Sequence, residues 1–273
     1  MNSIEIRPDD ITPLDAIAAG VVGVRILFVN AFGVGQGDHW TLIDAGLPGS
    51  ARRIQVWAAR HFGSASPNAI VLTHGHFDHV GAVSDLLEKW DVPVYAHIEE
   101  HPYLNGQRSY PPPDPSVGGG MMTRMSFLYP RSPIDISGRL HALPEGGALP
   151  FMPGWRWIHT PGHTPGHVSL FRDQDRMLIA GDAFCTTKPE SAYASITQKP
   201  ELHGPPAYFT TDWVAARRSV QHLALLKPNF VAPGHGRPTS DESAARALEV
   251  LADRFEEIAV PARGRYVSRP LRG

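Results

Sequence analysis

Residues 73–82 read THGHFDHVGA and place three histidines and one aspartate within six positions. They follow directly on residues 69–72, AIVL, whose short apolar run predicts a buried strand. Titratable side chains are costly to bury, so a cluster of them at the end of a buried strand is unusual. The H-x-H-x-D-H spacing has few structural uses, whereas imidazole and carboxylate together bind transition metals such as zinc, iron or manganese. The stretch therefore predicts a metal site.

The same arrangement recurs three more times along the chain. Strand-like runs at residues 155–158, 177–180 and 230–232 are followed closely by His163, Asp182 and His235, each with glycines nearby. Alone, Asp182 would be read as a helix cap and Gly-His-Gly at 234–236 as a turn. Together with the first cluster, they predict seven ligand-type groups at one edge of a sheet. That number is enough for two ions, and the two oxygens of Asp182 suit a bridge between them.

Strand-like and helical patterns alternate along most of the chain. Residues 21–29 and 40–43 are expected to be strands with a hairpin-like turn over residues 33–37. Residues 50–62 have helical spacing, with Ser50 placed to cap the helix and one side formed by Ile54, Trp57, Ala58 and His61. A short helix is expected around residues 86–87, a strand at 92–96, and helices at 212–226 and 240–258. The alternation predicts a single α/β layered domain over residues 1–273.

Residues 101–153 interrupt this alternation with runs of three prolines and three glycines. Two interpretations stay open. Either the apolar side chains of this segment pack it down as a long surface loop, or they form a lid and the wall of a substrate pocket. These side chains are Met121, Met122, Met125, Phe127, Leu128 and Tyr129.

Composition limits the partners and the compartment. The formal charge is −2 and no dense Lys/Arg block is present, which argues against nucleic acid and against an anionic membrane surface as partners. The single cysteine, Cys185, excludes an internal disulfide and fits a reducing compartment. The first residues lack the apolar run of a secretory peptide, so we expect a cytoplasmic protein. A homodimer is left open.

The motif set resembles that of the metallo-β-lactamase-fold hydrolases. The resemblance rests on THGHFDH at 73–79, TPGHTPGH at 160–167, GDA at 181–183, PGHG at 233–236 and DAG at 44–46. It spans the chain from about Val21 to the C-terminal helix. The implied fold is a four-layer αββα sandwich, with the metals at one edge and residues 101–153 as an irregular, lid-like insertion.

The resemblance also implies a ligand set. His74, His76 and His163 would hold a first metal, Asp78, His79 and His235 a second, and Asp182 would bridge both. Two divalent ions, zinc first and iron or manganese as alternatives, would activate a shared water for attack on an electrophilic carbon or phosphorus. Asp78 and Asp182 are the expected catalytic carboxylates, with Asp78 orienting the nucleophile or passing its proton to the leaving group.

Other residues carry weaker expectations. Asp44 is expected to orient a ligand or loop near the metals, and His167 to support the site or the fold. Cys185 either lines the pocket or fills the core as a small apolar side chain. Lys188, Tyr193 and His203 are candidate substrate contacts.

The substrate class follows partly by elimination. Cys185 stands where lactonases of this fold often have tyrosine, and only a short segment after His235 is left for the helical domain of glyoxalase-II-type thioesterases. The missing export signal argues against an antibiotic-hydrolysing β-lactamase, and RNA-binding features are not seen. A hydrolase of small esters, lactones or thioesters with an apolar acyl group remains.

Three alternatives are kept. The first is an iron-dependent oxidoreductase similar to sulfur dioxygenases, against which the complete second ligand set argues. The second is a β-lactamase- or phosphodiesterase-type hydrolase. The third is a non-catalytic metal-binding protein, which the complete set of expected ligands disfavours.

Overall fold

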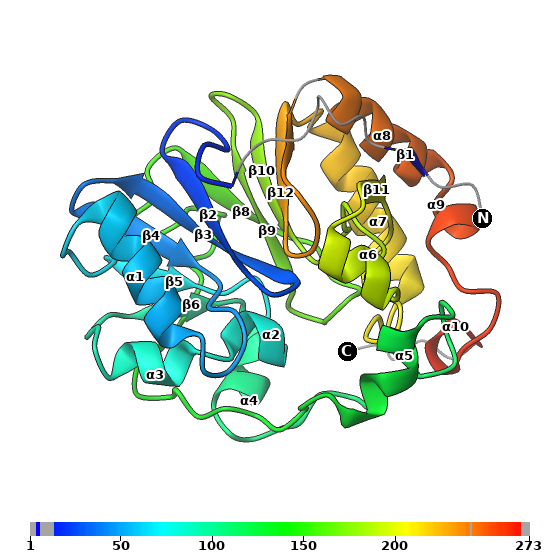
Figure 1. The fold of residues 1–273 in the computed structure, drawn as a ribbon, viewed down its shortest axis with the longest axis horizontal. Coiled ribbons are helices and arrows are strands. Elements are labelled where there is room, and N and C mark those ends of the chain that lie inside the picture. Colours follow the sequence, from blue (N-terminus) through cyan, green and yellow to red (C-terminus); the bar gives the residue numbers. More distant parts are fainter. Residues whose placement is uncertain (1–3, 6–13, 241, 269–273) are drawn as a thin grey trace.

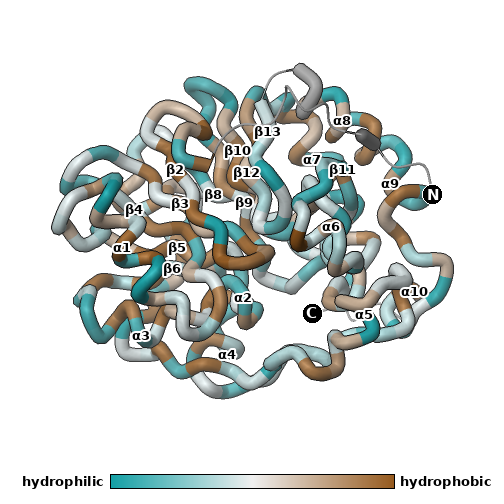
Figure 2. Tube along the Cα trace, in the orientation of Figure 1, coloured by the Kyte–Doolittle hydropathy of each residue, from teal (hydrophilic) through white to brown (hydrophobic). Residues whose placement is uncertain are grey.

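Two mixed β-sheets face each other and carry helices on their outer sides (Figure 1). The computed structural model describes residues 4–5, 14–240 and 242–268. Apolar stretches recur along the strands in the middle of the molecule (Figure 2). Within the described residues, no helix has both the length and the apolar character needed to cross a membrane.

The first sheet has six strands in chain order. Antiparallel pairs join β2 to β3 and β3 to β4, and parallel pairs continue from β4 to β7. The strands are β2 (Val21–Ile26), β3 (Val29–Gln36), β4 (His39–Ile43), β5 (Ala69–Val71), β6 (Val94–Ala96) and β7 (Leu140–Ala142). Its outer face packs against α1 (Ala51–Phe62) and α3 (Val83–Leu87), through side chains such as Ile54 and Leu86.

The second sheet has the order β13-β12-β10-β9-β8. Its strands are β8 (Trp155–His159), β9 (Val168–Arg172), β10 (Met177–Gly181), β12 (Phe230–Pro233) and β13 (Thr239–Ser240). Apolar side chains of α7 (Trp213–Leu225), α8 (Glu242–Asp253) and α9 (Phe255–Ile258) cover its outer face. Asp212 caps α7, because its carboxylate accepts hydrogen bonds from the Val214 and Ala215 amides.

A third apolar cluster fills the space between the two sheets. Val21, Phe32 and Ile43 come from the first sheet and pack with Leu170 and Ile179 of the second. Helix, sheet, sheet and helix thus form four layers around three apolar clusters, which confirms the predicted αββα sandwich.

Short elements complete the chain. They are β1 (Ile4–Glu5), which pairs with β11 (Glu201–Leu202), and α2 (Phe77–Val80), η2 (Ile98–Glu100), α4 (His101–Leu104), α5 (Met121–Met125), η3 (Ser126–Leu128), α6 (Ala192–Thr197) and α10 (Arg265–Ser268).

Two local predictions were wrong. Residues 21–29 are not one strand, because the chain turns at Leu27, where φ is +57°, and β3 starts at Val29. The turn does not cover residues 33–37, since β3 runs to Gln36 and only Gly37 of these residues lies in the turn to β4. Gly33 lies within that strand, where the ring of Phe62 packs on it so closely that a Cβ would stand 2.5 Å from a ring carbon.

The helical predictions needed smaller corrections. His61 is exposed, and Phe62 takes the buried place on α1. The Ser50 side chain does not cap this helix, because its hydroxyl donates to the Leu47 carbonyl. The helix expected over 240–258 is divided at Arg254 into α8 and α9. Residues 101–153 are not irregular throughout, since they supply the edge strand β7.

Candidate metal centre

The seven expected ligands meet at one edge of the two sheets. The chain after β5 carries four of them, the β8–β9 loop carries His163, and β10 and β12 lead into Asp182 and His235. All seven side chains are buried: His74, His76, Asp78, His79, His163, Asp182 and His235. Strands from both sheets end here, which is why residues more than 150 positions apart in sequence become neighbours.

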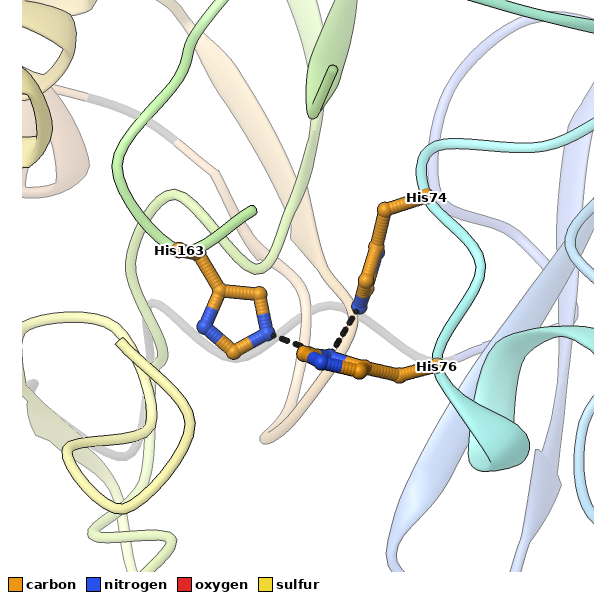
Figure 3. A group of neighbouring side chains, drawn as sticks. All are labelled: His74, His76 and His163. Carbon is orange, nitrogen blue, oxygen red and sulfur yellow. Dashed lines mark hydrogen bonds between the residues drawn. The ribbon is translucent and has the colours of Figure 1, made fainter. Parts of the chain in front are cut away.

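A first group consists of His74, His76 and His163. Nε2 of His74 lies 3.0 Å from Nδ1 of His76, and the same Nδ1 lies 2.9 Å from Nε2 of His163 (Figure 3). One nitrogen from each ring therefore faces a common point.

A second group consists of Asp78, His79 and His235, whose potential ligand atoms lie within 4.8 Å of one another. Asp182 lies between the two groups. Its Oδ2 is 3.4 Å from His163 Nε2 and 3.2 Å from His235 Nε2, and its Oδ1 is 3.4 Å from His79 Nε2. The carboxylate thus contacts residues of both groups.

In four of the five imidazole rings, the outer nitrogen, which is the Nδ1 that points away from the other ligands, contacts an oxygen atom. Nδ1 of His74 faces the Thr73 hydroxyl, Nδ1 of His79 the Asp44 carboxylate, Nδ1 of His163 the Thr210 hydroxyl, and Nδ1 of His235 the Phe28 carbonyl. The two hydroxyls donate their own protons elsewhere, to Asp44 and to the Pro206 carbonyl. We therefore assign the imidazole proton to Nδ1 in these four rings, which leaves a lone pair on each inner Nε2.

This protonation pattern fits a metal ion. Nδ1 of His76 carries at most one proton, so at least one of its two close contacts with a ring nitrogen lacks a hydrogen bond unless a cation lies between. His79 Nε2 and Asp182 Oδ1 are buried and lie 3.4 Å from each other, and neither makes a hydrogen bond. Buried polar atoms of this kind are normally satisfied, and a divalent cation satisfies both.

The pKa values of the first group and of Asp182 agree with this. Burial, reinforced by neighbouring imidazoles, lowers the pKa of His74 and His76 well below the usual range, and burial lowers the pKa of His163 to about 4. These three rings are neutral at pH 7, the form that binds metal. Burial raises the pKa of Asp182, but His235 and His79 outweigh it and hold that pKa well below its usual value. The carboxylate between the groups is therefore ionised.

Glycine is required at position 234 by the crowding of the centre. A Cβ there would stand 2.2 Å from Asp182 Oδ1 and 2.8 Å from a carbon of the His79 ring. Asn30 stabilises this turn, since its side-chain amide donates to the carbonyls of Pro233 and Gly236.

Asp44 supports the second group, as expected from the sequence. Its Oδ1 accepts from the Thr73 amide, and its Oδ2 accepts from the Thr73 hydroxyl and from Nδ1 of His79. The backbone is left-handed here, with φ at +59°, a conformation that aspartate and asparagine tolerate better than most residues.

We predict that Asp44→Asn weakens the second group while the fold is kept. The asparagine amide would face the His79 ring, so the ring would lose the acceptor that keeps its proton on Nδ1. The affinity for one ion should fall about 10–100-fold, as is usual when a residue supporting a ligand is lost. Metal content after dialysis against a mild chelator measures it, and two ions retained as in the wild type would contradict this role.

His167 supports the centre through the backbone. Its Nε2 accepts from the Asp182 amide at 2.8 Å, and its Nδ1 bonds to the Thr160 hydroxyl. It lies outside all the ligand groups among the described residues.

The weaker candidates lie in different places. Cys185 is fully buried, and burial, reinforced by Asp182, raises the pKa of its thiol well above the usual value, so it is no nucleophile. His203 pairs with Cys185 through the backbone and lies 3.9 Å from the Glu190 carboxylate. Lys188 is half-buried, and Tyr193 is 71% exposed.

An aromatic wall beside the first group was not predicted from sequence. The Phe209 ring stacks on His76 at 4.5 Å between centroids, and Phe77 and Tyr129 lie 5.6 Å apart next to it. Tyr208 contacts both Tyr129 and Phe209. Tyr129 belongs to the 101–153 insertion, which therefore reaches the metal-ligand loop.

A separate histidine group lies away from the centre. His97, Glu99 and His159 have potential ligand atoms within 4.8 Å of one another, but they are half-buried or exposed. The rings of His97 and His159 are stacked, with 4.2 Å between their centroids and 15° between their planes.

Comparison with known proteins agrees with this geometry. Residues 24–235 match the family model of the metallo-beta-lactamase superfamily. The chain is 46% identical over 245 residues to the probable metallo-hydrolase YflN of Bacillus subtilis (strain 168), covering 88% of this chain and 93% of YflN. A shorter similarity, 34% over 119 residues, covers 42% of this chain and 32% of a hydroxyacylglutathione hydrolase from Xylella fastidiosa (strain M23).

A solved structure shows the same fold. TTHA1623, crystallised in a di-iron-bound form, is 29% identical, covers 83% of this chain and 97% of its own, and superposes with a TM-score of 0.54. The four-layer sandwich, the ligand-type cluster at its edge and the family match together define the class. The chain belongs to the metallo-β-lactamase superfamily.

Proposed function

We propose that the protein is a dinuclear metal-dependent hydrolase of small ester, lactone or thioester substrates. The observation that supports it most is the convergence of five imidazoles and two carboxylates, with the outer nitrogens of four rings held and inner lone pairs turned toward common points. The similarity to a probable metallo-hydrolase supports hydrolysis, and that to a hydroxyacylglutathione hydrolase supports including thioesters.

The position of each residue determines which ion we assign to it. We assign His74, His76 and His163 to one ion, Asp78, His79 and His235 to the other, and Asp182 to both. When bound, two divalent ions supply a hydroxide at neutral pH and polarise the scissile carbonyl. Asp182 faces both groups, because its oxygens lie 3.2–3.4 Å from ring nitrogens of His79, His163 and His235, and its negative charge would serve both ions.

Asp78 is proposed as the proton carrier. Its Oδ2 lies 3.4 Å from His235 Nε2, at the side of the centre where Tyr129 and Phe77 form the aromatic wall. A carboxylate in this place can orient the nucleophile and pass a proton to the leaving group. Zinc is the proposed metal, with iron or manganese as alternatives that suit the same donors.

Residues 101–153 are proposed as the wall of the substrate pocket within a single domain. Met121, Phe127 and Leu128 are more than half exposed, so they do not serve to pack the segment down. Tyr129 continues from them into the aromatic wall, and its hydroxyl donates to the Met122 carbonyl. We infer that this surface receives the apolar acyl group.

Replacing Phe127 and Leu128 together by serine should change acyl preference without changing metal content. Losing contact with about two methylene groups costs on the order of 1.4 kcal/mol, so kcat/KM for a long-chain ester relative to an acetyl ester should fall about 10-fold. Val56→Ser, on an exposed face of α1, is the matched control. An unchanged ratio would show that the segment does not contact the substrate.

Elemental analysis of purified protein, coupled to a screen of lactones, aryl esters, thioesters and phosphodiesters, tests the proposed function. Two ions per chain and turnover of an ester, lactone or thioester are expected. Oxygen consumption with a thiol substrate and a single iron would favour an oxidoreductase instead. We propose a cytoplasmic location, which the single buried, unpaired cysteine supports.

A further inference from the structure

Glu100 is a fully buried carboxylate outside both ligand groups. It lies at the end of η2 and accepts four hydrogen bonds. Its Oε1 accepts from the Gly166 amide at 2.8 Å and from the Thr164 hydroxyl at 2.7 Å. Its Oε2 accepts from the Gly75 amide at 3.0 Å and from the Tyr110 hydroxyl.

Three of these four donors belong to the two loops that carry the first group. Gly75 stands between His74 and His76 in the loop after β5, and Thr164 and Gly166 follow His163 in the loop between β8 and β9. The two loops extend from different sheets. One carboxylate therefore joins the two pieces of chain whose imidazoles must come within 3 Å of each other.

Tyr110 adds a third piece of chain. Its hydroxyl also accepts from the Gly75 amide at 2.9 Å, and its ring lies 4.4 Å from the His76 ring. A Cβ at position 75 would stand 2.7 Å from that hydroxyl oxygen, so only glycine fits between the two histidines. The start of the 101–153 insertion is thus tied to the same point.

We propose that Glu100 is a positioning residue that sets the distance between His76 and His163 and thereby the metal affinity of the first group. The inference rests on the proposed dinuclear centre. It follows from the hydrogen bonds alone, because a buried carboxylate with four donors from three segments fixes all three relative to one another.

Glu100→Gln is a sharp test because it keeps size and shape. The glutamine side chain has one oxygen and one amino group, and the amino group cannot accept. In either orientation it faces two donors that formerly met an oxygen, either Gly75 and Tyr110 or Gly166 and Thr164. One of the two loops should therefore move away from the other.

The experiment titrates metal-free full-length protein with Zn²⁺ against a chromophoric chelator. Wild type should bind two ions, and Glu100→Gln should bind one as tightly as wild type and the other about 10–100-fold more weakly. Glu99→Gln is the matched control, one position earlier on an exposed side chain, and should behave like wild type. Glu99→Gln also removes the carboxylate of the surface group with His97 and His159. If this variant still binds two ions, both ions belong to the buried centre.

Backgrounds that lack one ligand show which ion is affected. In His235→Ala, the remaining ion occupies the first group, and adding Glu100→Gln should weaken its binding 10–100-fold. In His163→Ala, where the remaining ion occupies the second group, adding Glu100→Gln should leave the affinity for that ion unchanged. A merely structural role of Glu100 would weaken the binding of both ions.

Two milder variants keep the test decisive if Glu100→Gln does not fold. Tyr110→Phe and Thr164→Val each remove one donor and should weaken the same ion by a smaller factor. Wild-type affinities in both of these, or in folded Glu100→Gln, would overturn the role of Glu100. A wild-type protein that binds fewer than two ions would instead overturn the proposed function.

Discussion

Asp182→Ala is expected to abolish hydrolysis and to leave at most one ion per chain. The carboxylate is in contact with ligands of both sets, through His79, His163 and His235. Its removal leaves inner nitrogens without a negative charge between them, so two cations would repel each other across the site. A loss of at least about 10²–10³-fold in kcat is expected, the usual effect of removing a group that stabilises charge at a reaction centre.

The fold should survive this substitution. The backbone of Asp182 is held separately, since its amide donates to His167, and the preceding strand β10 is hydrogen-bonded to β9 and β12. Circular dichroism and thermal unfolding check this point. Asp173→Ala, which removes an exposed carboxylate in the turn between β9 and β10, is the matched control and should keep full activity. Wild-type turnover in Asp182→Ala would refute a bridging role.

Removal of metal is expected to have the second large effect. Dialysis against a strong chelator should abolish turnover, and adding Zn²⁺ should restore it. Stability should fall as well, because an ion that binds only the folded chain stabilises it by about 4 kcal/mol when present at 1,000 times its Kd. The centre is expected to depend on metal because Nε2 of His74 and Nε2 of His163 both lie close to Nδ1 of His76, and one proton cannot satisfy both contacts.

Thermal unfolding with and without chelator measures the stability effect, and the Asp182→Ala protein serves as the reference. Its unfolding temperature should respond much less to chelation than that of the wild type. Unchanged turnover in metal-free wild-type protein would exclude the proposed chemistry. Loss of stability without any turnover in the metal-loaded protein would identify a structural metal site.

The convergence of the four segments that carry the expected ligands could be predicted from sequence, because each combines an unusual residue pattern with a simple structural context. A strand that ends in histidine or aspartate beside glycine places that side chain at a sheet edge, and the convergence follows from the fold. The predictions failed where long-range packing decides. Gly33 looks like a turn residue, yet it lies in β3 because Phe62, 29 positions later, packs on it.

The supporting residues were only partly predictable. Asp44 could be found because it also ends a strand-like run. Glu100 could not, since the local sequence HIEEH gives no reason to bury one glutamate and expose its neighbour. Its four donors lie 10 to 66 positions away and meet it only in the folded chain. The aromatic wall is similar, because Phe77, Tyr129 and Phe209 are adjacent only in three dimensions.

Anomalous diffraction from crystals of the zinc-loaded protein tests the central claim most directly. We predict two peaks at the zinc edge, about 3.5–4 Å apart, with His74, His76 and His163 around one, Asp78, His79 and His235 around the other, and Asp182 between them. A single peak, or peaks only at the surface beside His97 and His159, would contradict the account.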